Sequence, residues 1–209
     1  MLEPQERSAL TAGAARFDIP AGTVIYRDAD RPRLAVVLDG LLRVFLTSSE
    51  GRQVTVRYTR AGDVLGAAAT VGGPVDVSVQ AVTDSTVAMI DPGRLVSLGR
   101  MNAQVAWAIA EELSRRLYEV LNELAGTAFL PLRDRIIRHL LDLAADAQSG
   151  GGSVAHTTQQ ELADAVGSVR EVVGRSLAEL RATGLIETTR DGIKVLDVAA
   201  LHRELSGVT

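Results

Sequence analysis

The segment TQQELADAVGSVREVVGRSLAELRATG, residues 158–184, contains the patterns of two short helices that meet at a glycine. Thr158 and Glu161 have the S/T-x-x-E spacing of a capping box, in which a hydroxyl and a carboxylate satisfy free amides at a helix start. A first helix is therefore expected to run from there to Gly167, and a second to follow it up to Gly184. Two short helices joined in this way are typical of a helix-turn-helix.

The second helix of this segment has an apolar side and a polar side. At about 100° per residue, one narrow arc is apolar and is expected to face the core of a small domain: Val169, Val173, Leu177 and Leu180. The opposite side presents Arg170, Glu171, Gly174, Arg175 and Ala178. Small residues let a helix backbone enter a major groove, where Arg pairs with guanine and Glu accepts from cytosine. The alternative is that these charges form exposed ion pairs on a solvated face.

A β-hairpin is expected directly after the second helix. Residues 185–195 read LIETTRDGIKV, with an Asp-Gly turn between two short β-rich runs. Arg190 and Lys194 flank the expected tip, where they could contact phosphates and so position the protein without reading sequence. The alternative for each is an ordinary polar hairpin residue. Helix-turn-helix and hairpin together predict a winged helix-turn-helix.

The first half of the chain has the pattern of a β-structure. Strands are expected at residues 23–26, 34–38, 41–46, 53–58, 64–65, 77–82 and 86–90, separated by turns that contain glycine. Many short strands at this spacing are typical of an antiparallel sandwich or barrel. A jelly-roll β-roll fits best, and with the helical second half it gives an α+β chain.

The spacing of apolar residues becomes helical after Asp91-Pro92-Gly93. Six of them follow the a/d pattern of a coiled-coil seam: Ala106, Ala110, Leu113, Leu117, Val120 and Leu124. This long helix either packs only on its own β-domain or also pairs with its copy in a second subunit. The small Ala residues at one end and Leu and Val at the other favour the homodimer.

The end of the long helix suggests where the domains divide. Gly126-Thr127 is expected to interrupt it, and Pro131 to begin the next helix at a tolerated first-turn position. The predicted domains are a β-roll at residues 1–98, a dimerisation helix at 99–126 and a winged helix-turn-helix at 127–209. The run SGGGS at 149–153 predicts a flexible surface loop.

Composition excludes several chemistries. The absence of cysteine rules out disulfides and thiolate-bound metals. The three histidines, His139, His156 and His202, lie outside the β-roll, and no catalytic arrangement of side chains is visible, so we expect no metal, no cofactor and no enzyme activity. Without a secretory signal or a long apolar run, a cytoplasmic protein with no membrane partner is expected. The net charge of −4 argues against a nucleic-acid binder, so any DNA contact must come from local charge.

The segment at 158–175 strongly resembles the cyclic-AMP receptor/fumarate–nitrate regulator (CRP/FNR) family of transcription regulators. The resemblance extends over essentially the whole chain, through Arg115-Arg116-Leu117 on the long helix and Ala128-Phe129-Leu130 at the hinge. It implies a cytoplasmic homodimer on double-stranded DNA that contacts RNA polymerase if it activates. The form Arg-Glu-x-Val-Gly-Arg implies that Arg170, Glu171 and Arg175 read a TGTGA-like half-site of a palindrome.

Further DNA contacts are expected at the starts of the two helices. Thr158 and Gln159 begin the first, and Gly174 lets the second approach the duplex. Val169 departs from the Ser that is common in the family, so a cap or phosphate contact is expected to have moved to Ser168.

The β-roll departs further from the family pattern. Relatives that bind cyclic nucleotides have a Glu for the ribose and an Arg for the phosphate, whereas this chain has Gly66-Ala67-Ala68 and Val77-Ser78 with Asp76 beside them. Val120 and Leu121 replace the polar pair that touches the base. A phosphate would meet no arginine there, so the usual cyclic-AMP site is expected to be absent. The expected sensor either holds a different, less charged effector at these positions, or it is filled by side chains and the protein binds DNA without an effector.

Three alternatives stay open at this point. A cyclic nucleotide could bind in an atypical mode and regulate DNA binding. The β-roll could be a cyclic-nucleotide module whose helical tail contacts proteins. A cupin-like enzyme is the most distant alternative, because the β-roll lacks histidine ligands for a metal.

Overall fold

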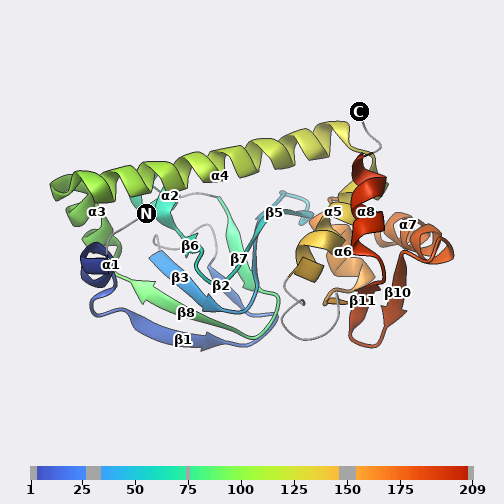
Figure 1. The fold of residues 1–209 in the computed structure, drawn as a ribbon, viewed down its shortest axis with the longest axis horizontal. Helices are drawn as coiled ribbons and strands as arrows, with labels where there is room; N and C mark the ends of the chain where they lie inside the picture. Colours follow the sequence, from blue (N-terminus) through green and yellow to red (C-terminus); the bar gives the residue numbers. More distant parts are fainter. Residues whose placement is uncertain (1–3, 27–33, 74–75, 146–153, 207–209) are drawn as a thin grey trace. The chain divides into compact units, whose positions relative to one another are not determined.

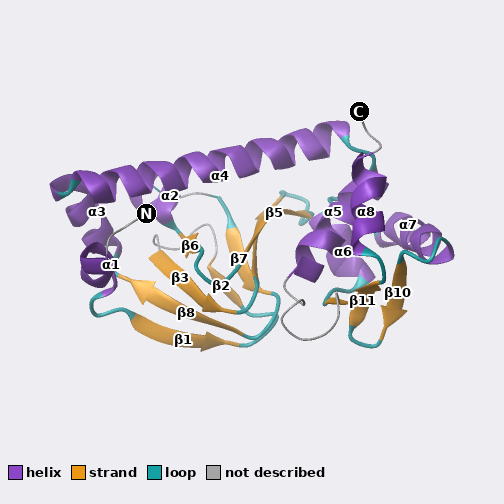
Figure 2. Cartoon of the chain, in the orientation of Figure 1, coloured by secondary structure: helices purple, strands orange, loops and turns teal. Residues whose placement is uncertain are grey.

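The computed structural model describes residues 4–26, 34–73, 76–145 and 154–206, and the glycine-rich segment 149–153 lies outside them. The chain forms two compact units, one of residues 1–46 and 56–122 and the other of residues 47–55 and 123–209. Figures 1 and 2 show the order of the elements along the chain. None of the helices within the described ranges is long and apolar enough to cross a membrane.

The first unit contains a roll of two four-stranded sheets, with strand orders β1-β8-β3-β6 and β2-β7-β4-β5. The strands are β1 Ala15–Ile19, β2 Val24–Tyr26, β3 Leu34–Asp39, β4 Leu42–Thr47, β5 Gln53–Thr59, β6 Val64–Leu65, β7 Ser78–Ala81 and β8 Ser85–Ile90. The pairs β1–β8, β3–β8, β3–β6, β2–β7 and β4–β7 are antiparallel. All seven strands expected from the sequence are present, and β1 is an addition that sequence analysis missed.

Alternation along the strands builds the core of the roll. Val37, Leu42 and Val87 are almost completely buried between the two sheets. Gly40 forms the turn between β3 and β4 with φ +86°, and a Cβ atom there would collide with the backbone of Asp84 and Ser85. Glycine is therefore required at this turn for both conformation and space.

Four helices of the described chain begin in the first unit: α1 Pro4–Thr11, α2 Ala67–Gly72, α3 Pro92–Met101 and α4 Ala103–Phe129. Asp91 caps α3 by accepting from the amide of Gly93 at 2.9 Å. Asn102 then separates α3 from α4, because its Oδ1 accepts from the amides of Gln104 and Val105. The expected start of the long helix at residue 99 was therefore wrong.

The long helix also ends later than expected. α4 continues through Gly126 and Thr127 to Phe129, so the predicted interruption there was wrong. A glycine inside a helix costs only about 1 kcal/mol, and here it leaves room for the guanidinium of Arg138, which a Cβ would strike. Pro131, which precedes α5 rather than forming its first residue, terminates the run.

The second unit is a winged helix. It contains α5 Leu132–Ala144, β9 Val154–Ala155, α6 Gln159–Ala165, α7 Arg170–Ala182, β10 Ile186–Thr189, β11 Gly192–Val195 and α8 Val198–Ser206, and its strands form one sheet in the order β10-β11-β9. Residues from five elements of this unit are at most 1% exposed: Ile136, Leu140, Ala155, Leu162, Leu177, Leu180 and Leu201. This core holds α6 and α7 against the sheet.

Candidate nucleic-acid interface and ligand cavity

The capping box expected at the start of α6 is present. The hydroxyl of Thr158 accepts from the amide of Glu161 at 3.1 Å, and the Glu161 carboxylate accepts from the amide of Thr158 at 2.7 Å. Thr158 is exposed and Gln159 is half-buried. The reciprocal bonds fix the direction in which α6 leaves the preceding strand.

The turn between α6 and α7 depends on a glycine. Gly167 has φ +65°, a left-handed conformation that glycine adopts without strain, and the amide of Ser168 donates to the carbonyl of Ala163 at 2.9 Å. Val169 was expected to face the core with Val173, but it is the N-cap of α7 and 56% exposed. No side chain caps α7, so Ser168 does not supply the expected cap, and a phosphate contact there stays a prediction.

The charged side chains on the polar side of α7 have no partner among the residues that the structure describes. Arg170, Glu171 and Arg175 are exposed, while Val173, Leu177 and Leu180 are buried as expected. Within the described ranges, no ion pair or hydrogen bond engages the side chains of Arg170, Glu171 and Arg175. The alternative that these charges form ion pairs with one another therefore does not describe this helix, and both guanidinium groups and the carboxylate are available to another molecule.

Gly174 lies on the same side of α7. It is half-buried, and a Cβ there would lie 3.4 Å from Oε1 of Gln159 at the start of α6. The structure therefore brings together Gln159 and Gly174, two of the residues expected to contact DNA.

The wing is a β10–β11 hairpin in which Thr189 pairs with Gly192. Its two loop residues are therefore Arg190 and Asp191, so the turn lies one residue earlier than the expected Asp-Gly pair. A Cβ on Gly192, which has φ +139°, would collide with the Ala155 carbonyl of β9. Glycine is needed here for close strand approach, and it leaves Arg190 exposed at the tip.

A cavity of about 330 Å³ lies beside the wing and has Thr158, Gln159 and Arg190 in its wall. The other expected DNA contacts, Ser168, Arg170, Glu171, Gly174, Arg175 and Lys194, do not line it. Lys194 is exposed on β11 opposite Glu187.

The seam expected on α4 is largely exposed in the single chain. Ala106, Ala110, Leu117, Val120 and Leu124 are exposed and Leu113 is half-buried. Two large aromatic residues that the seam pattern did not include, Trp107 and Tyr118, are 68% and 67% exposed on the same helix. Near its start, α4 is fixed to the roll by Ile109, which packs on a cluster that contains Leu34 and Ile90.

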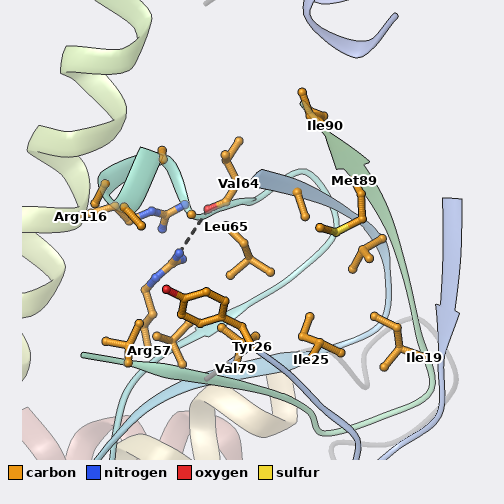
Figure 3. Close-up of a pocket in the computed structure, with 18 of the residues that line it drawn as sticks. Ile19, Ile25, Tyr26, Arg57, Val64, Leu65, Val79, Met89, Ile90 and Arg116 are labelled. Carbon is orange, nitrogen blue, oxygen red and sulfur yellow. Dashed lines mark hydrogen bonds between the residues drawn. The ribbon is translucent and has the colours of Figure 1, made fainter. Parts of the chain in front are cut away.

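The roll encloses a cavity of about 1050 Å³, shown in Figure 3. Five of the seven expected effector positions line it: Gly66, Ala67, Ala68, Val77 and Val120. Ser78 and Leu121 are not among the lining residues. The described side chains leave this space open, which favours the alternative of a pocket that holds an effector.

Two arginines line the cavity, although sequence analysis found none at the usual phosphate position. Arg57 extends from β5 and Arg116 from α4 (Figure 3). A signal for Arg57 was available, because it lies two residues from the completely buried Thr55 and Thr59 and so shares their face of the strand. Arg116 similarly lies three and four residues from Leu113 and Val120.

The two arginines have different surroundings. Arg116 donates to Glu112 at 2.7 Å, to Glu119 at 2.8 Å and to Asp63 at 3.0 Å. Arg57 donates through Nη2 to the carbonyl of Val64 at 3.2 Å, and its Nη1 is buried without a hydrogen-bond partner in the described chain. Burial, and then repulsion from Arg116, lowers the pKa of Arg57 to about 10, so it remains a cation at neutral pH. Burial alone would raise the pKa of Asp63, but hydrogen bonds from the Arg60 amide and Arg116 bring it below its usual value.

The three histidines lie in the second unit, and no cluster of three metal-ligating side chains occurs within the described ranges. His139 is 5% exposed on α5. Burial, followed by repulsion from Arg138 and Arg135, lowers the pKa of His139 to about 4. It is therefore neutral at physiological pH.

Comparisons with known proteins agree with this architecture. Residues 16–102 match the model of the cyclic nucleotide-binding domain, and residues 134–204 match that of the Crp-like helix-turn-helix domain. The transcriptional regulator LdrP of Thermus thermophilus is 33% identical over 87% of this chain and 92% of its own length. A CRP-like cAMP-activated global transcriptional regulator of Mycobacterium tuberculosis is 27% identical over 97% of this chain and 93% of its own length. These relatives are named as regulators, not enzymes.

Solved structures of transcription regulators also match this chain in fold. The c-di-GMP-responsive global regulator CLP of Xanthomonas campestris has a TM-score of 0.79 and 27% identity, covering 93% of this chain and all of its own. A CRP/FNR-family regulator from Thermus thermophilus has a TM-score of 0.77 and 29% identity, covering 92% and 98% of the two chains.

Proposed function

Because the chain belongs to the CRP/FNR family of DNA-binding transcription regulators, we propose that it acts in the cytoplasm as a homodimer on a near-palindromic, TGTGA-like DNA site. Arg170, Glu171 and Arg175 read bases in the major groove. Thr158, Gln159, Ser168, Arg190 and Lys194 contact the backbone, and Gly174 permits close approach. If the protein activates transcription, it also contacts RNA polymerase.

The observation that carries this proposal is the unpaired polar side of α7. Arg170, Glu171 and Arg175 are exposed and make no ion pair with one another or with other described residues. Arg donates bidentately to guanine O6 and N7, and Glu accepts from cytosine N4. The opposite side of the helix, with Val173 and Leu177, is buried in the core of this unit, so the charged residues face away from that core.

The homodimer proposal rests on α4. Its exposed apolar residues, including Leu117 at 58% and Leu124 at 63%, follow the heptad spacing of a seam. A two-fold axis along this seam would present one α7 from each subunit. The half-sites would then lie about one helical turn, roughly 34 Å, apart on the duplex.

The domain roles follow the same scheme. The β-roll, residues 1–98, senses an effector that is not bound in the usual cyclic-AMP mode, since Ala67, Val77 and Val120 occupy polar positions of that site. Residues 99–126 provide the dimer seam and residues 127–209 bind DNA, with the helix itself ending at Phe129. A cyclic nucleotide bound in an atypical mode remains the second candidate, favoured by the two arginines in the cavity wall.

Selection of bound sequences from random duplexes tests the proposal. We expect a near-palindrome of TGTGA-like half-sites and a binding constant that falls steeply with salt. Running the selection with and without cell extract reports whether a small molecule is required. If no sequence is enriched under either condition, sequence-specific binding is refuted. Calorimetry with cyclic AMP tests the second candidate: we expect no binding at micromolar concentration, and tight binding would favour an atypical cyclic-nucleotide site.

A further inference from the structure

Five charged side chains lie on the wall of the roll cavity, and they differ in their partners. Asp18 accepts from the hydroxyl of Thr86 at 2.9 Å, and Asp91 caps α3 through the amide of Gly93. Glu112 pairs with Arg116, which also holds two further carboxylates. Arg57 makes no ion pair within the described ranges and donates only to the carbonyl of Val64, although Asp63 and Glu119 lie near enough to attract its charge.

A buried cation without an ion-pair partner is costly, because Arg stays protonated and burial removes its hydration. The cost is concentrated at Nη1 of Arg57, which is shielded from solvent and has no acceptor among the described residues. The hydroxyl of Tyr26 is the second buried polar atom of the cavity wall without a partner. In Figure 3 the Tyr26 hydroxyl and the Arg57 guanidinium point into the same part of the cavity. The cavity therefore offers two donors to a single acceptor group that carries negative charge.

The rest of the wall specifies the body of such a ligand. It is built mainly of aliphatic side chains from both sheets and from α4, including Ile25, Val79, Met89 and Leu113. A volume of about 1050 Å³ is at the upper end of small-molecule sites. Sugar hydroxyls or base nitrogens placed against this wall would lose hydrogen bonds to water without replacement.

We propose that the roll cavity binds a small carboxylic acid with an apolar body, whose two carboxylate oxygens accept from Nη1 of Arg57 and the hydroxyl of Tyr26. Two donors match the two oxygens of a carboxylate, which would also give an ion-pair partner to the one guanidinium of the wall that has none among the described residues. That this acid regulates DNA binding rests on the function proposed above, whereas its binding does not.

Thermal shift and calorimetry on the full-length wild-type protein test the proposal. The probes are hexanoate, octanoate and decanoate, each compared with the primary alcohol of the same chain length, and cyclic AMP. We expect the acids to raise Tm in proportion to the logarithm of their concentration, and the matched alcohols and cyclic AMP to raise it far less. Acids that stabilise the protein no more than their alcohols would overturn the proposal, as would cyclic AMP binding more tightly than every acid.

Three variants locate the binding site. Arg57→Gln keeps a donor for Val64 but removes the charge, and it should weaken acid binding about tenfold to hundredfold. Tyr26→Phe keeps the ring and should weaken binding about threefold to tenfold. Arg52→Gln changes an exposed arginine paired with Glu50 outside the cavity, and it should bind the acids as the wild type does. Equal affinity in all three variants would contradict the assigned contacts.

Two controls separate a loss of acid binding from unfolding, and the ligand assignment from the proposed function. Desolvation is the largest effect on Arg57, so the ligand-free Arg57→Gln protein should unfold at a Tm close to that of the wild type, and lost binding then cannot be ascribed to unfolding. DNA binding by the ligand-free wild-type protein is measured in parallel. Sequence-specific DNA binding without acid binding overturns only this inference, whereas acid binding without DNA binding overturns the proposed function and leaves the ligand assignment intact.

Discussion

The buried His139 predicts a loss of stability in mild acid. Its folded-state pKa of about 4 lies below the ordinary value of 6.5, so in the interval between them the unfolded chain binds a proton that the folded chain does not. Stability that is fully present above pH 6.5 is therefore lost as the pH falls toward 4, and no further loss from this residue occurs below it. At about 1.4 kcal/mol for each pKa unit, the full loss is about 3 kcal/mol.

The surroundings of His139 explain why its pKa is lowered rather than raised. Glu123 places a carboxylate beside the ring, with Oε1 4.0 Å from Nε2, but Arg138 already pairs with that carboxylate at 3.2 Å. Burial raises the pKa of Glu123, which further weakens its attraction for an imidazolium. Burial and the charges of Arg138 and Arg135 therefore outweigh Glu123, and the ring stays neutral.

The assay compares the wild type with His139→Gln. Urea unfolding at pH 7 and at pH 4.5 gives the free energy of unfolding for both proteins. Subtracting the change measured for the variant from the change measured for the wild type cancels the contribution of carboxylates that titrate in both. We expect the wild type to lose about 2–3 kcal/mol more than the variant on acidification. An NMR titration of the His139 ring that gives a pKa near 6.5, or an equal acid effect in both proteins, would refute the reasoning.

Two further predictions concern α4 and the wing. Leu117→Arg places a charge on a residue that is 58% exposed in the single chain, so we expect a folded monomer in analytical ultracentrifugation, with a Tm lowered by the loss of the partner subunit; a persisting dimer would show that the seam lies elsewhere. Gly192→Ala drives a Cβ toward the carbonyl of Ala155 and should lower stability by about 1–3 kcal/mol in thermal unfolding. Gly184→Ala, also at positive φ but with open space around it, is the matched control, and equal losses in the two variants would rule out steric collision as the cause.

Local signals in the sequence were sufficient for most of the fold. Short β-rich runs between glycine-containing turns located seven strands, and the Thr158/Glu161 spacing located the capping box with both of its hydrogen bonds. These features depend on residues close together in the chain. The family resemblance then supplied the order of the parts, and the domain and structural matches agree with it.

The failures came from contacts between distant residues. Gly126 looked like a helix end because its neighbour in space, Arg138, cannot be identified from local sequence. Val169 fits the apolar arc of α7 by angle, but the turn after Gly167 makes it an exposed N-cap. The effector positions were taken from the usual cyclic-nucleotide motif, so Arg57 and Tyr26 were missed because they belong to strands outside that motif.

The central claim is that the polar side of α7 reads DNA bases, and the binding constant of Arg175→Ala for the selected site tests it most directly. The account predicts a loss of about 1–3 kcal/mol and a relaxed preference at one guanine. Arg203→Ala, which removes an exposed arginine from α8, should bind like the wild type. An Arg175→Ala protein that binds its best site with wild-type affinity and unchanged sequence preference would contradict the account.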